Sequence, residues 1–498
     1  MYRTGNFRSR AHVANAGNVA IGGTRGMTAR HIPGDFWHAA TRMRSDGEIV
    51  LGDYGQRPVL SVHRQIIQEK AVKITRIGDH ELQAAYGGSP TDIVEDYKPR
   101  TFLGEAEDGT KLTLIGAQGG YNLTGLHGLG QEFRCYAVVE GDHVDEYQRY
   151  SHARYLFDGP WKNVVISDRE SFHAIGGGGL EVYRQEASTW IEVQASNGAS
   201  LREYETRILI PLMSFLAVAG QCKISVSRMN VRSNSDSPWL EVHPSRSPEF
   251  PARASRPGPI PIKHLTLERA ASWIDASEKA EGLIEALAGL DESLPIETQV
   301  ITLAAVAEGM HRRFHCDKVA FPELNKAQRR AVRKAAKDAA TAQLAEFGIN
   351  DHDRIDPALD GPLAQINDMK FRERMRELAE VARCFDPEIV SDFHDWTKSV
   401  AEIRNKFVHQ LMDDDDECEQ PWNPEESRVE KQKFYNLATA VGYSLSWVLK
   451  LNLLAHGGFE RGLVSSEILQ YEPYEYSRAY VASLISDSAA RSKGGIQD

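Results

Sequence analysis

Apolar residues recur at helical spacing near the C-terminal end of the chain. At about 100° per residue they share one face of a helix, and they are Val400, Ile403, Phe407 and Leu411. Asn405 and His409 lie about 40° apart on another side of that helix, one turn from each other, and Arg404 lies at the border between the two faces. The pattern therefore predicts an amphipathic helix that presents a guanidinium, an amide and an imidazole away from the core.

The same periodicity predicts that the C-terminal half of the chain is helical. The helices expected from it are Leu265–Leu290 as one helix or a pair, Thr298–Phe314, Glu323–Phe347, Phe371–Phe385, Pro387–Leu411 and Ser427–Leu454. Gly348 is a natural C-terminal stop for the third of these. Several antiparallel helices joined by loops form a helical bundle.

From about residue 36 to residue 245 the pattern changes to short β-prone runs separated by Gly, Asp or Pro. The runs are Glu48–Leu51, Val59–His63, Ala71–Thr75, Lys111–Ile115, Arg134–Val139, Asn163–Ile166, Leu180–Arg184, Trp190–Gln194, Ile224–Val231 and Trp239–Val242. One helix, about Leu201–Val218, interrupts them, and Ala106–Thr110 forms a hairpin turn. The sequence therefore predicts an α+β protein whose N-terminal part is dominated by antiparallel sheet.

Six prolines crowd the stretch between the two patterns, and they are Pro244, Pro248, Pro251, Pro257, Pro259 and Pro261. Such density disfavours a helix or a central strand, so we expect a domain boundary there. The predicted division is an N-terminal arm at residues 1–35, a β-rich sensor or regulatory domain at 36–245, a linker at 246–262 and the helical-bundle domain at 263–498.

Composition narrows the classes of function. No apolar run approaches the ~18 residues of a membrane span, and no membrane partner is expected. The five cysteines are scattered without a Cys-x-x-Cys pair, which disfavours a disulfide framework or a zinc site and fits a reducing cytoplasm. We expect no metal and no cofactor.

The distribution of charge limits how the protein meets nucleic acid. Residues 1–258 hold equal numbers of acidic and basic side chains, so the whole formal charge of −12 belongs to the C-terminal half. An acidic half disfavours broad, nonspecific binding to nucleic acid, and any RNA contact is expected to be local.

A cationic run in the third predicted helix is the candidate for such a local contact. Its six cations fall within 12 residues and are Lys326, Arg329, Arg330, Arg333, Lys334 and Lys337. They either grip RNA phosphates or form a solvated helix face, and the sequence favours neither interpretation.

Three further features receive structural interpretations. The acidic run Asp413–Asp416 with Glu417 is expected to be a hydrated loop rather than a cation site, because consecutive acids cannot all converge. Glu308 and His311 lie one turn apart and are expected to be structural rather than a metal pair. Gly116–Gly120 is expected to be a loop rather than a phosphate cradle, because no clear strand and helix flank it.

The residues Arg404-Asn405-Lys406-Phe407-Val408-His409 resemble the Arg-x-x-x-x-His signature of HEPN ribonucleases, including the polar residue after the arginine. Leu303–Phe314 and Phe371–Leu378 are similar to helices of the ApeA-type HEPN domain. The β-rich half is similar to the ApeA N-terminal domain, notably around Phe102–Leu114 and Arg202–Ala219. The resemblance spans about residues 40–455. It implies a bacterial antiviral-defence protein that stops infected cells by cutting RNA, as in abortive infection.

The resemblance also assigns roles. RNA carries a 2′-hydroxyl that can attack the adjacent phosphate without a metal, so the expected activity is that of a metal-independent endoribonuclease, a hydrolase-class nuclease. His409 would transfer protons, Arg404 would stabilise charge on the phosphate, and Asn405 would donate to the phosphate or fix the imidazole tautomer. The family pairs two such helices, which implies a homodimer or a higher even-numbered oligomer. Transfer RNA is one candidate substrate, and a phage-derived molecule or a nucleotide is the expected trigger.

Two other functions stay open. A non-catalytic, ligand-sensing dimeric scaffold fits the acidic charge of the bundle. The toxin of a toxin–antitoxin pair is a further possibility, and the large N-terminal half argues against it. In a non-catalytic scaffold, Arg404 and His409 would be a surface pair that caps or packs a helix.

Overall fold

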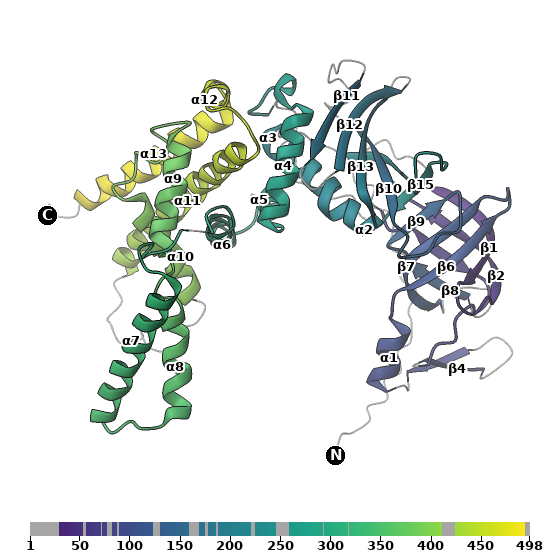
Figure 1. Ribbon diagram of the computed structural model, residues 1–498, viewed down its shortest axis with the longest axis horizontal. Helices are drawn as coiled ribbons and strands as arrows, with labels where there is room; N and C mark the ends of the chain where they lie inside the picture. The colour runs from purple at the N-terminus through teal and green to yellow at the C-terminus, as the bar shows by residue number, and fades with distance from the viewer. Residues whose placement is uncertain are drawn as a thin grey trace.

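The chain folds into a β-rich part followed by a mostly helical part, which confirms the fold class predicted from the sequence (Figure 1). The structure is a computed structural model. It describes residues 29–52, 56–70, 72–76, 82–86, 89–122, 130–158, 169–174, 178–185, 188–220, 225–245, 258–291, 293–316, 318–410 and 424–493. The barrel forms one end of an arch and the helical bundle the other, with α3 (Ile210–Ala219), α4 (Leu267–Ala280) and α5 (Leu283–Ala288) between them (Figure 1).

The first part is a six-stranded antiparallel barrel. Its strands are β1 (Arg30–His38), β2 (Arg44–Leu51), β3 (Val59–Val62), β6 (Arg100–Ala106), β7 (Lys111–Asn122) and β8 (Gly130–Arg134). They run in the order β7-β6-β1-β2-β3-β8, and pairing of β8 with the second half of β7 closes the ring. Alternate side chains fill the interior, among them Phe36, Leu60 and Phe102.

Glycines let the barrel strands approach and bend. Gly34 and Gly47 lie opposite each other in the β1–β2 pair. A Cβ at Gly34 would lie 2.4 Å from the Glu105 carbonyl oxygen, and one at Gly47 would lie 2.4 Å from the Ser61 carbonyl oxygen. Only glycine fits such close backbone contacts, so this pair sets the curvature at that point.

The predicted hairpin between β6 and β7 is confirmed. The Ala106 N–H donates to the Thr110 carbonyl oxygen at 2.9 Å. Gly109 adopts φ +84° in this turn, a left-handed conformation that glycine tolerates best.

The sheet continues from the barrel as an open wing. Its strands are β9 (Ala137–Glu140), β10 (Tyr150–Asp158), β11 (Arg169–Ala174), β12 (Gly178–Gln185), β13 (Ser188–Ala199), β14 (Ser225–Arg232) and β15 (Leu240–Pro244). Their order is β11-β12-β13-β10-β14-β15-β9, and β9 joins the wing to β7. A separate hairpin of β4 (Val72–Arg76) and β5 (Leu82–Tyr86) and the short helix α1 (Pro90–Asp96) extend from the barrel (Figure 1).

Several local predictions in this part are wrong. Arg134–Val139 is not one strand, because the chain leaves β8 at Arg134 and enters β9 at Ala137. Gly116–Gly120 is not a loop but lies inside β7, where Gly116 has φ +61° and Gly119 closely approaches β8. These glycines therefore serve strand pairing rather than loop flexibility. The strand expected at Asn163–Ile166 lies outside the described residues.

Helices on both sides of the proline-rich stretch share one buried core. The helix predicted at Leu201–Val218 is confirmed as a continuous rod of α2 (Leu201–Tyr204), a π-helical turn and α3 (Ile210–Ala219). The helix pair expected next is α4 (Leu267–Ala280) and α5 (Leu283–Ala288). The Trp273 indole N–H of α4 donates to the Ser214 hydroxyl of α3 at 3.0 Å.

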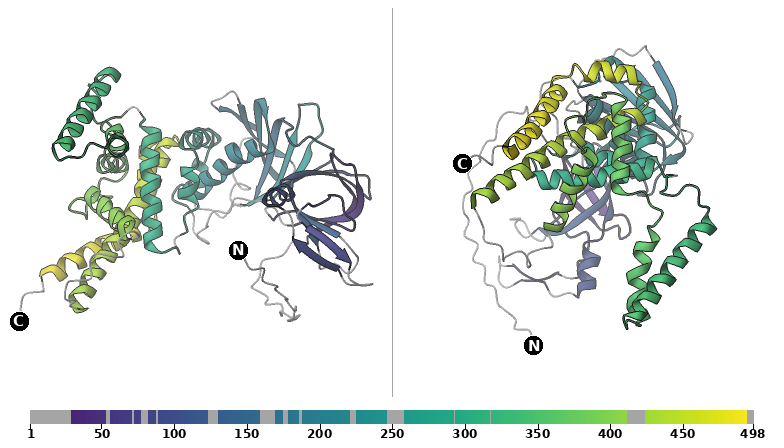
Figure 2. Two further views of the ribbon diagram at one scale, coloured as in Figure 1. Left: turned by 90° about the horizontal axis from the view of Figure 1, so that it is seen from below. Right: turned by 90° about the vertical axis from the view of Figure 1, so that its left-hand side faces the viewer.

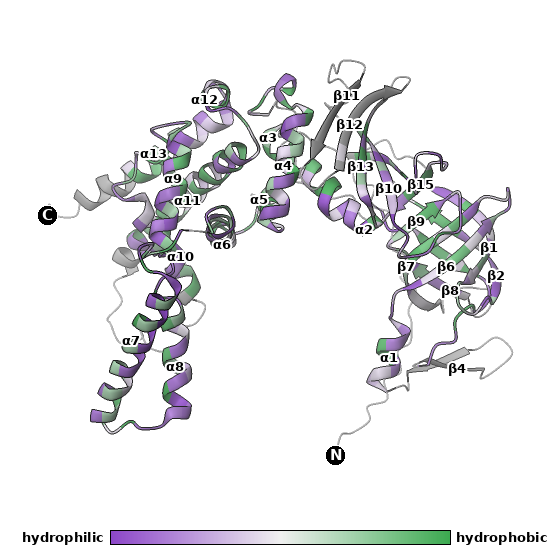
Figure 3. Cartoon of the chain, viewed as in Figure 1, coloured by the Kyte–Doolittle hydropathy of each residue, from purple (hydrophilic) through white to green (hydrophobic). Residues whose placement is uncertain are grey.

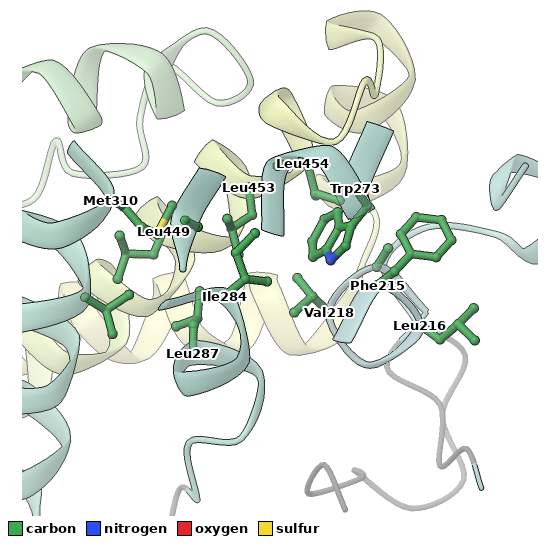
Figure 4. Packing of buried hydrophobic residues seen from close by; sticks show 14 of the residues in the cluster. Phe215, Leu216, Val218, Trp273, Ile284, Leu287, Met310, Leu449, Leu453 and Leu454 are labelled. Atoms are coloured by element: carbon green, nitrogen blue, oxygen red, sulfur yellow. The ribbon is translucent and has the colours of Figure 1, made fainter. Parts of the chain in front are cut away.

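The buried cluster therefore continues from the wing of the sheet into the helices. Phe215 and Val218 of α3, Trp273 of α4, and Leu453 and Leu454 of the bundle all belong to it (Figure 4). The boundary at residues 246–262 stays a prediction, because residues 246–257 lie outside the described part.

The bundle is built around one long helix. Its members are α6 (Ile296–Phe314), α9 (Phe371–Arg383), α10 (Trp396–Gln410), α11 (Pro424–His456), α12 (Arg461–Ile468) and α13 (Glu472–Lys493). α11 packs against α6, α9, α10 and α13. Among the described residues, α11 is also the one helix long and apolar enough to cross a membrane, but 72% of its apolar window is buried inside the protein. That burial is what a core helix of a globular bundle shows.

A helical hairpin projects from the bundle, and Figures 1 and 2 both show it standing away from the other helices. It consists of α7 (Lys326–Glu346) and α8 (His352–Ala364). Hydrophilic residues alternate with more hydrophobic ones along both helices (Figure 3). α8 was not predicted, because Pro357 and Pro362 lie inside it and such residues usually argue against a helix.

The start of α10 differs from the prediction. It was expected at Pro387 but lies at Trp396, because residues 386–395 form turns. Asp395 caps the helix, since its Oδ1 accepts from the Lys398 N–H at 2.9 Å.

Candidate active site

α10 lies between α6, α9 and α11, which fixes the orientation of its faces. Val400, Ile403 and Phe407 are buried, as the periodicity predicted. The Phe407 ring meets the Phe434 ring of α11 edge to face, with centroids 5.2 Å apart. Leu411, the last residue of the predicted stripe, lies outside the described residues.

Arg404 and Asn405 lie where α10 leaves the core. Asn405 is exposed and Arg404 is half-buried. The Arg404 Nη1–H donates to Asn405 Oδ1 at 3.0 Å, and the guanidinium lies 5.4 Å from the centroid of the Phe371 ring of α9. The guanidinium is thus held from two directions.

Within the described part of the chain, no carboxylate forms an ion pair with Arg404. The N–H donors of its guanidinium are therefore held in place, and no carboxylate of those residues neutralises its positive charge. Such a group can bind phosphate oxygens in a fixed geometry.

His409 belongs to α10 by its backbone, one turn after Asn405. Its side chain lies outside the described residues, so its distance from Arg404 stays a prediction. The acidic run Asp413–Asp416 with Glu417 also lies outside them.

Two further cations of α10 have partners of their own. The Lys406 ammonium lies 5.3 Å from the centroid of the Phe434 ring. Lys398 pairs with Glu402 at 3.5 Å, one turn away along the same helix. Lys406 lies about 160° from Arg404 around the helix axis, and Glu402 offsets the charge of Lys398, so neither lysine adds to the charge that Arg404 presents.

The six cations of α7 share a face, and the structure places part of that face against α8. Lys337 pairs with Asp360 at 2.8 Å and with Asp356 at 3.0 Å. These two carboxylates raise the pKa of Lys337. Arg333 donates to the Ala364 carbonyl oxygen at 3.0 Å.

The other four cations of α7 differ from Lys337 and Arg333 in their partners. Lys334 pairs with Asp338 of its own helix at 2.7 Å. Lys326, Arg329 and Arg330 form no ion pair with the described residues. The candidate RNA contact is thus concentrated at the N-terminal end of α7, and RNA binding by the whole set stays a prediction.

The Glu308 and His311 side chains are not brought together. Glu308 pairs with Arg312 at 2.9 Å. His311 is fully buried, and its Nε2–H donates to Glu377 at 2.8 Å while its Nδ1 accepts from Arg374 at 3.3 Å. Burial lowers the pKa of His311. These contacts tie α6 to α9.

A second polar cluster, on β9 and β15, was not predicted from any pattern in the sequence. Glu140, Glu241 and His243 place ligand-type atoms within 4.8 Å of one another. Arg30 donates to both oxygens of Glu140, at 2.8 and 2.9 Å, and His243 lies 3.1 Å from it. Hydrogen bonds from His243 and Arg30 lower the pKa of Glu140 to about 2. Because an arginine already occupies that carboxylate, the cluster is better suited to an ion-pair network than to a cation.

Comparison with known proteins adds no relative: no family model, no curated protein and no solved structure matches this chain. The likeness to HEPN ribonucleases therefore stays an expectation that rests on the residues quoted for it.

Proposed function

We propose that the protein is a metal-independent endoribonuclease of bacterial anti-phage defence, acting in the cytoplasm, and that the open face of α10 carries its chemistry. The observation behind the proposal is the Arg404 guanidinium, which Asn405 and Phe371 hold at the edge of the bundle. His409 follows one turn later on the same helix. The Arg-x-x-x-x-His resemblance adds the reaction class.

The proposed reaction is attack by an RNA 2′-hydroxyl on the adjacent phosphorus. A base takes the hydroxyl proton, the bond from phosphorus to the 5′-oxygen breaks, and an acid returns a proton to that oxygen. The products are a 2′,3′-cyclic phosphate and a 5′-hydroxyl. Imidazole exchanges a proton near neutral pH, which suits His409 to either transfer. Arg404 offsets the charge that builds up on the phosphorane.

One helix supplies one imidazole, whereas the reaction needs both a base and an acid. We therefore propose that two copies of α10 meet across a two-fold axis and form one composite site, in a homodimer or a larger even-numbered assembly. The β-rich part would sense a phage-derived molecule or a nucleotide and control access to that site. Transfer RNA is the first substrate to examine.

Expression of the wild type beside His409→Ala tests this function. We expect the wild type to slow growth and fragment RNA once triggered, while His409→Ala does neither. Lys398→Ala, on the same helix, is the matched control and should behave like the wild type. Equal toxicity and equal RNA integrity in all three strains would contradict the proposal and favour the ligand-sensing scaffold.

A further inference from the structure

The hairpin of α7 and α8 buries almost nothing of its own. None of the 21 residues of α7 is buried, and Ile355 is the one buried residue of α8. α7 packs against α8, and no other helix or strand of the described chain has a comparable contact with it. Figures 1 and 2 show the hairpin standing free of the bundle. Because helices in proteins owe most of their stability to the packing of a face, the outer side of α7 is open to a partner.

A row of exposed side chains, four residues apart, runs along the whole of α7. Its members are Lys326, Arg330, Lys334, Asp338, Ala342 and Glu346. The charge of the row changes sign in the middle of the helix. Its N-terminal half carries three cations, and its C-terminal half carries two acids, which are the only acids of α7. The row is therefore complementary to an antiparallel copy of itself.

The middle of this row is accessible beside α8. α8 meets α7 at Arg333 and Lys337. At 100° per residue, the midpoint of Lys334 and Asp338 lies about 100° around the helix from the midpoint of those two. The next row on the far side holds small exposed residues, which are Ala327, Ala331, Ala335 and Ala339. Short side chains there let a second helix approach closely, as ridges packed into grooves require.

We propose that two copies of this chain meet through α7, antiparallel, about a two-fold axis at the level of Ala336. In that register Lys334 meets the partner's Asp338, and Lys326 lies opposite the partner's Glu346. Each pair occurs twice because the axis makes the contact isologous. Rows four residues apart pack with the helices crossing at about 50°, so the pairs nearest the axis contribute most.

The acids of the row favour a second copy over RNA as the occupant. Phosphates would be attracted by Arg330 and Lys334 but repelled by Asp338 and Glu346, whereas a second copy uses both halves. Lys334 pairs with Asp338 within one chain at 2.7 Å, but both side chains are exposed. Such a pair is weak and can be shared with the partner. The contact uses no residue of α10, so it does not depend on RNA cleavage.

The contact is expected to be weak when measured alone. α7 is about 32 Å long and about 10 Å wide, which offers less than the ~800 Å² that each partner of a stable complex buries. Association is therefore expected at micromolar protein concentrations and is expected to weaken as salt is added.

Sedimentation velocity of the nuclease-treated, full-length protein tests the proposal with two charge-reversed variants. One carries Arg330→Glu with Lys334→Glu, and the other carries Asp338→Lys with Glu346→Lys. Each variant alone should associate about tenfold more weakly than the wild type, because like charges then meet on both sides of the axis. An equimolar mixture of the two should regain the lost affinity, because opposite charges meet again.

Arg57→Glu with Arg64→Glu is the matched control, since it reverses two exposed arginines beside β3. It should associate like the wild type, and all variants should keep the wild-type melting temperature because the changed residues are exposed. A dimer held by α10 would persist in every variant, so the step that the reversals move reports the hairpin. Three results would overturn the proposal: no concentration-dependent step in the wild type, variants that associate as the wild type does, or a mixture no tighter than its components.

Discussion

At the scale of single residues, Arg404 shows how neighbours decide what a side chain can do. The sequence places it at the edge of the apolar stripe, and the structure adds Asn405 and the Phe371 ring as the groups that hold it. Asn405 is its neighbour in the sequence, but the hydrogen bond between them was not predicted, because Asn405 was expected to donate to the phosphate or to fix the imidazole tautomer. The second comes from α9, about 30 residues earlier in the chain, and no local pattern could reveal it.

His456 provides a test at this scale. Its ring stacks on Phe314 with centroids 3.9 Å apart, and burial, with help from His315 and Lys279, lowers its pKa to about 4. The unfolded chain takes up this proton near pH 6.5, whereas the folded protein takes it up only near pH 4. Stability from this group is therefore fully present above pH 6.5 and is lost as the pH falls toward 4, by about 3 kcal/mol at most.

Urea unfolding of the wild type and His456→Gln between pH 7.5 and pH 4.5 measures this difference. We expect the free energy of unfolding to fall less steeply with acidification in the variant. Part of the slope will remain, because burial also lowers the pKa values of His311 and His315. Identical slopes in the two proteins would contradict the assignment.

At the scale of elements, the barrel depends on the backbone contact at Gly34. A methyl group there would lie 2.4 Å from the Glu105 carbonyl oxygen, so β1 or β6 would have to move. We expect Gly34→Ala to lose about 2 kcal/mol or more of unfolding free energy. Chemical denaturation measures it.

Gly462→Ala is the matched control for that change. Apart from its chain neighbours and the backbone of its own helix, no described atom lies within 4 Å of the added methyl group, and Gly462 lies within α12. Alanine favours a helix over glycine, so this variant should be as stable as the wild type or slightly more stable. A Gly34→Ala protein as stable as this control would show that the barrel curvature does not need glycine.

The charged face of α7 illustrates a limit of sequence reasoning at the same scale. Six cations at helical spacing predicted either an RNA contact or a solvated face. The acids that occupy part of the set lie on α8, a helix whose internal prolines hid it from prediction. Apolar spacing predicted a helix only where no internal proline interrupted the pattern.

RNA binding as a function of salt concentration separates the two groups of cations. If the N-terminal end of α7 contacts phosphates, replacing Lys326, Arg329 and Arg330 by alanine should reduce the slope of log affinity against log salt by about 2 for single-stranded RNA. Lys337→Ala should leave the slope unchanged, because two carboxylates already pair with Lys337. Equal effects of the two changes would show that pairing with α8 does not hold in solution.

At the scale of the whole molecule, the order of a β-rich part and a helical part followed from periodicity alone. The closure of the barrel did not follow from periodicity, because it depends on β7 pairing with β6, β8 and β9 at once. The shared core around Trp273 could not be predicted from periodicity either. There, helices after the proline-rich stretch pack against helices and strands before it. Such contacts join residues far apart in the sequence.

The candidate site was likewise predictable from the sequence only in part. Spacing within one helix was enough to place Arg404 and Asn405 away from the core, and the burial pattern of α10 agrees. The cavity of about 790 Å³ lined by residues of α5, α6, α11 and α13 was not foreseen, since four separate helices and the loop after α5 contribute to it.

The proposed activity requires that Arg404 and His409 cut RNA together without a metal. Its most direct test is incubation of purified protein with labelled transfer RNA in EDTA, followed by analysis of the new ends. We expect fragments ending in 2′,3′-cyclic phosphate and 5′-hydroxyl groups for the wild type and Lys398→Ala, and intact RNA for Arg404→Ala and His409→Ala. Cleavage by the wild type that needs a divalent cation, or cleavage that persists in His409→Ala, would contradict it.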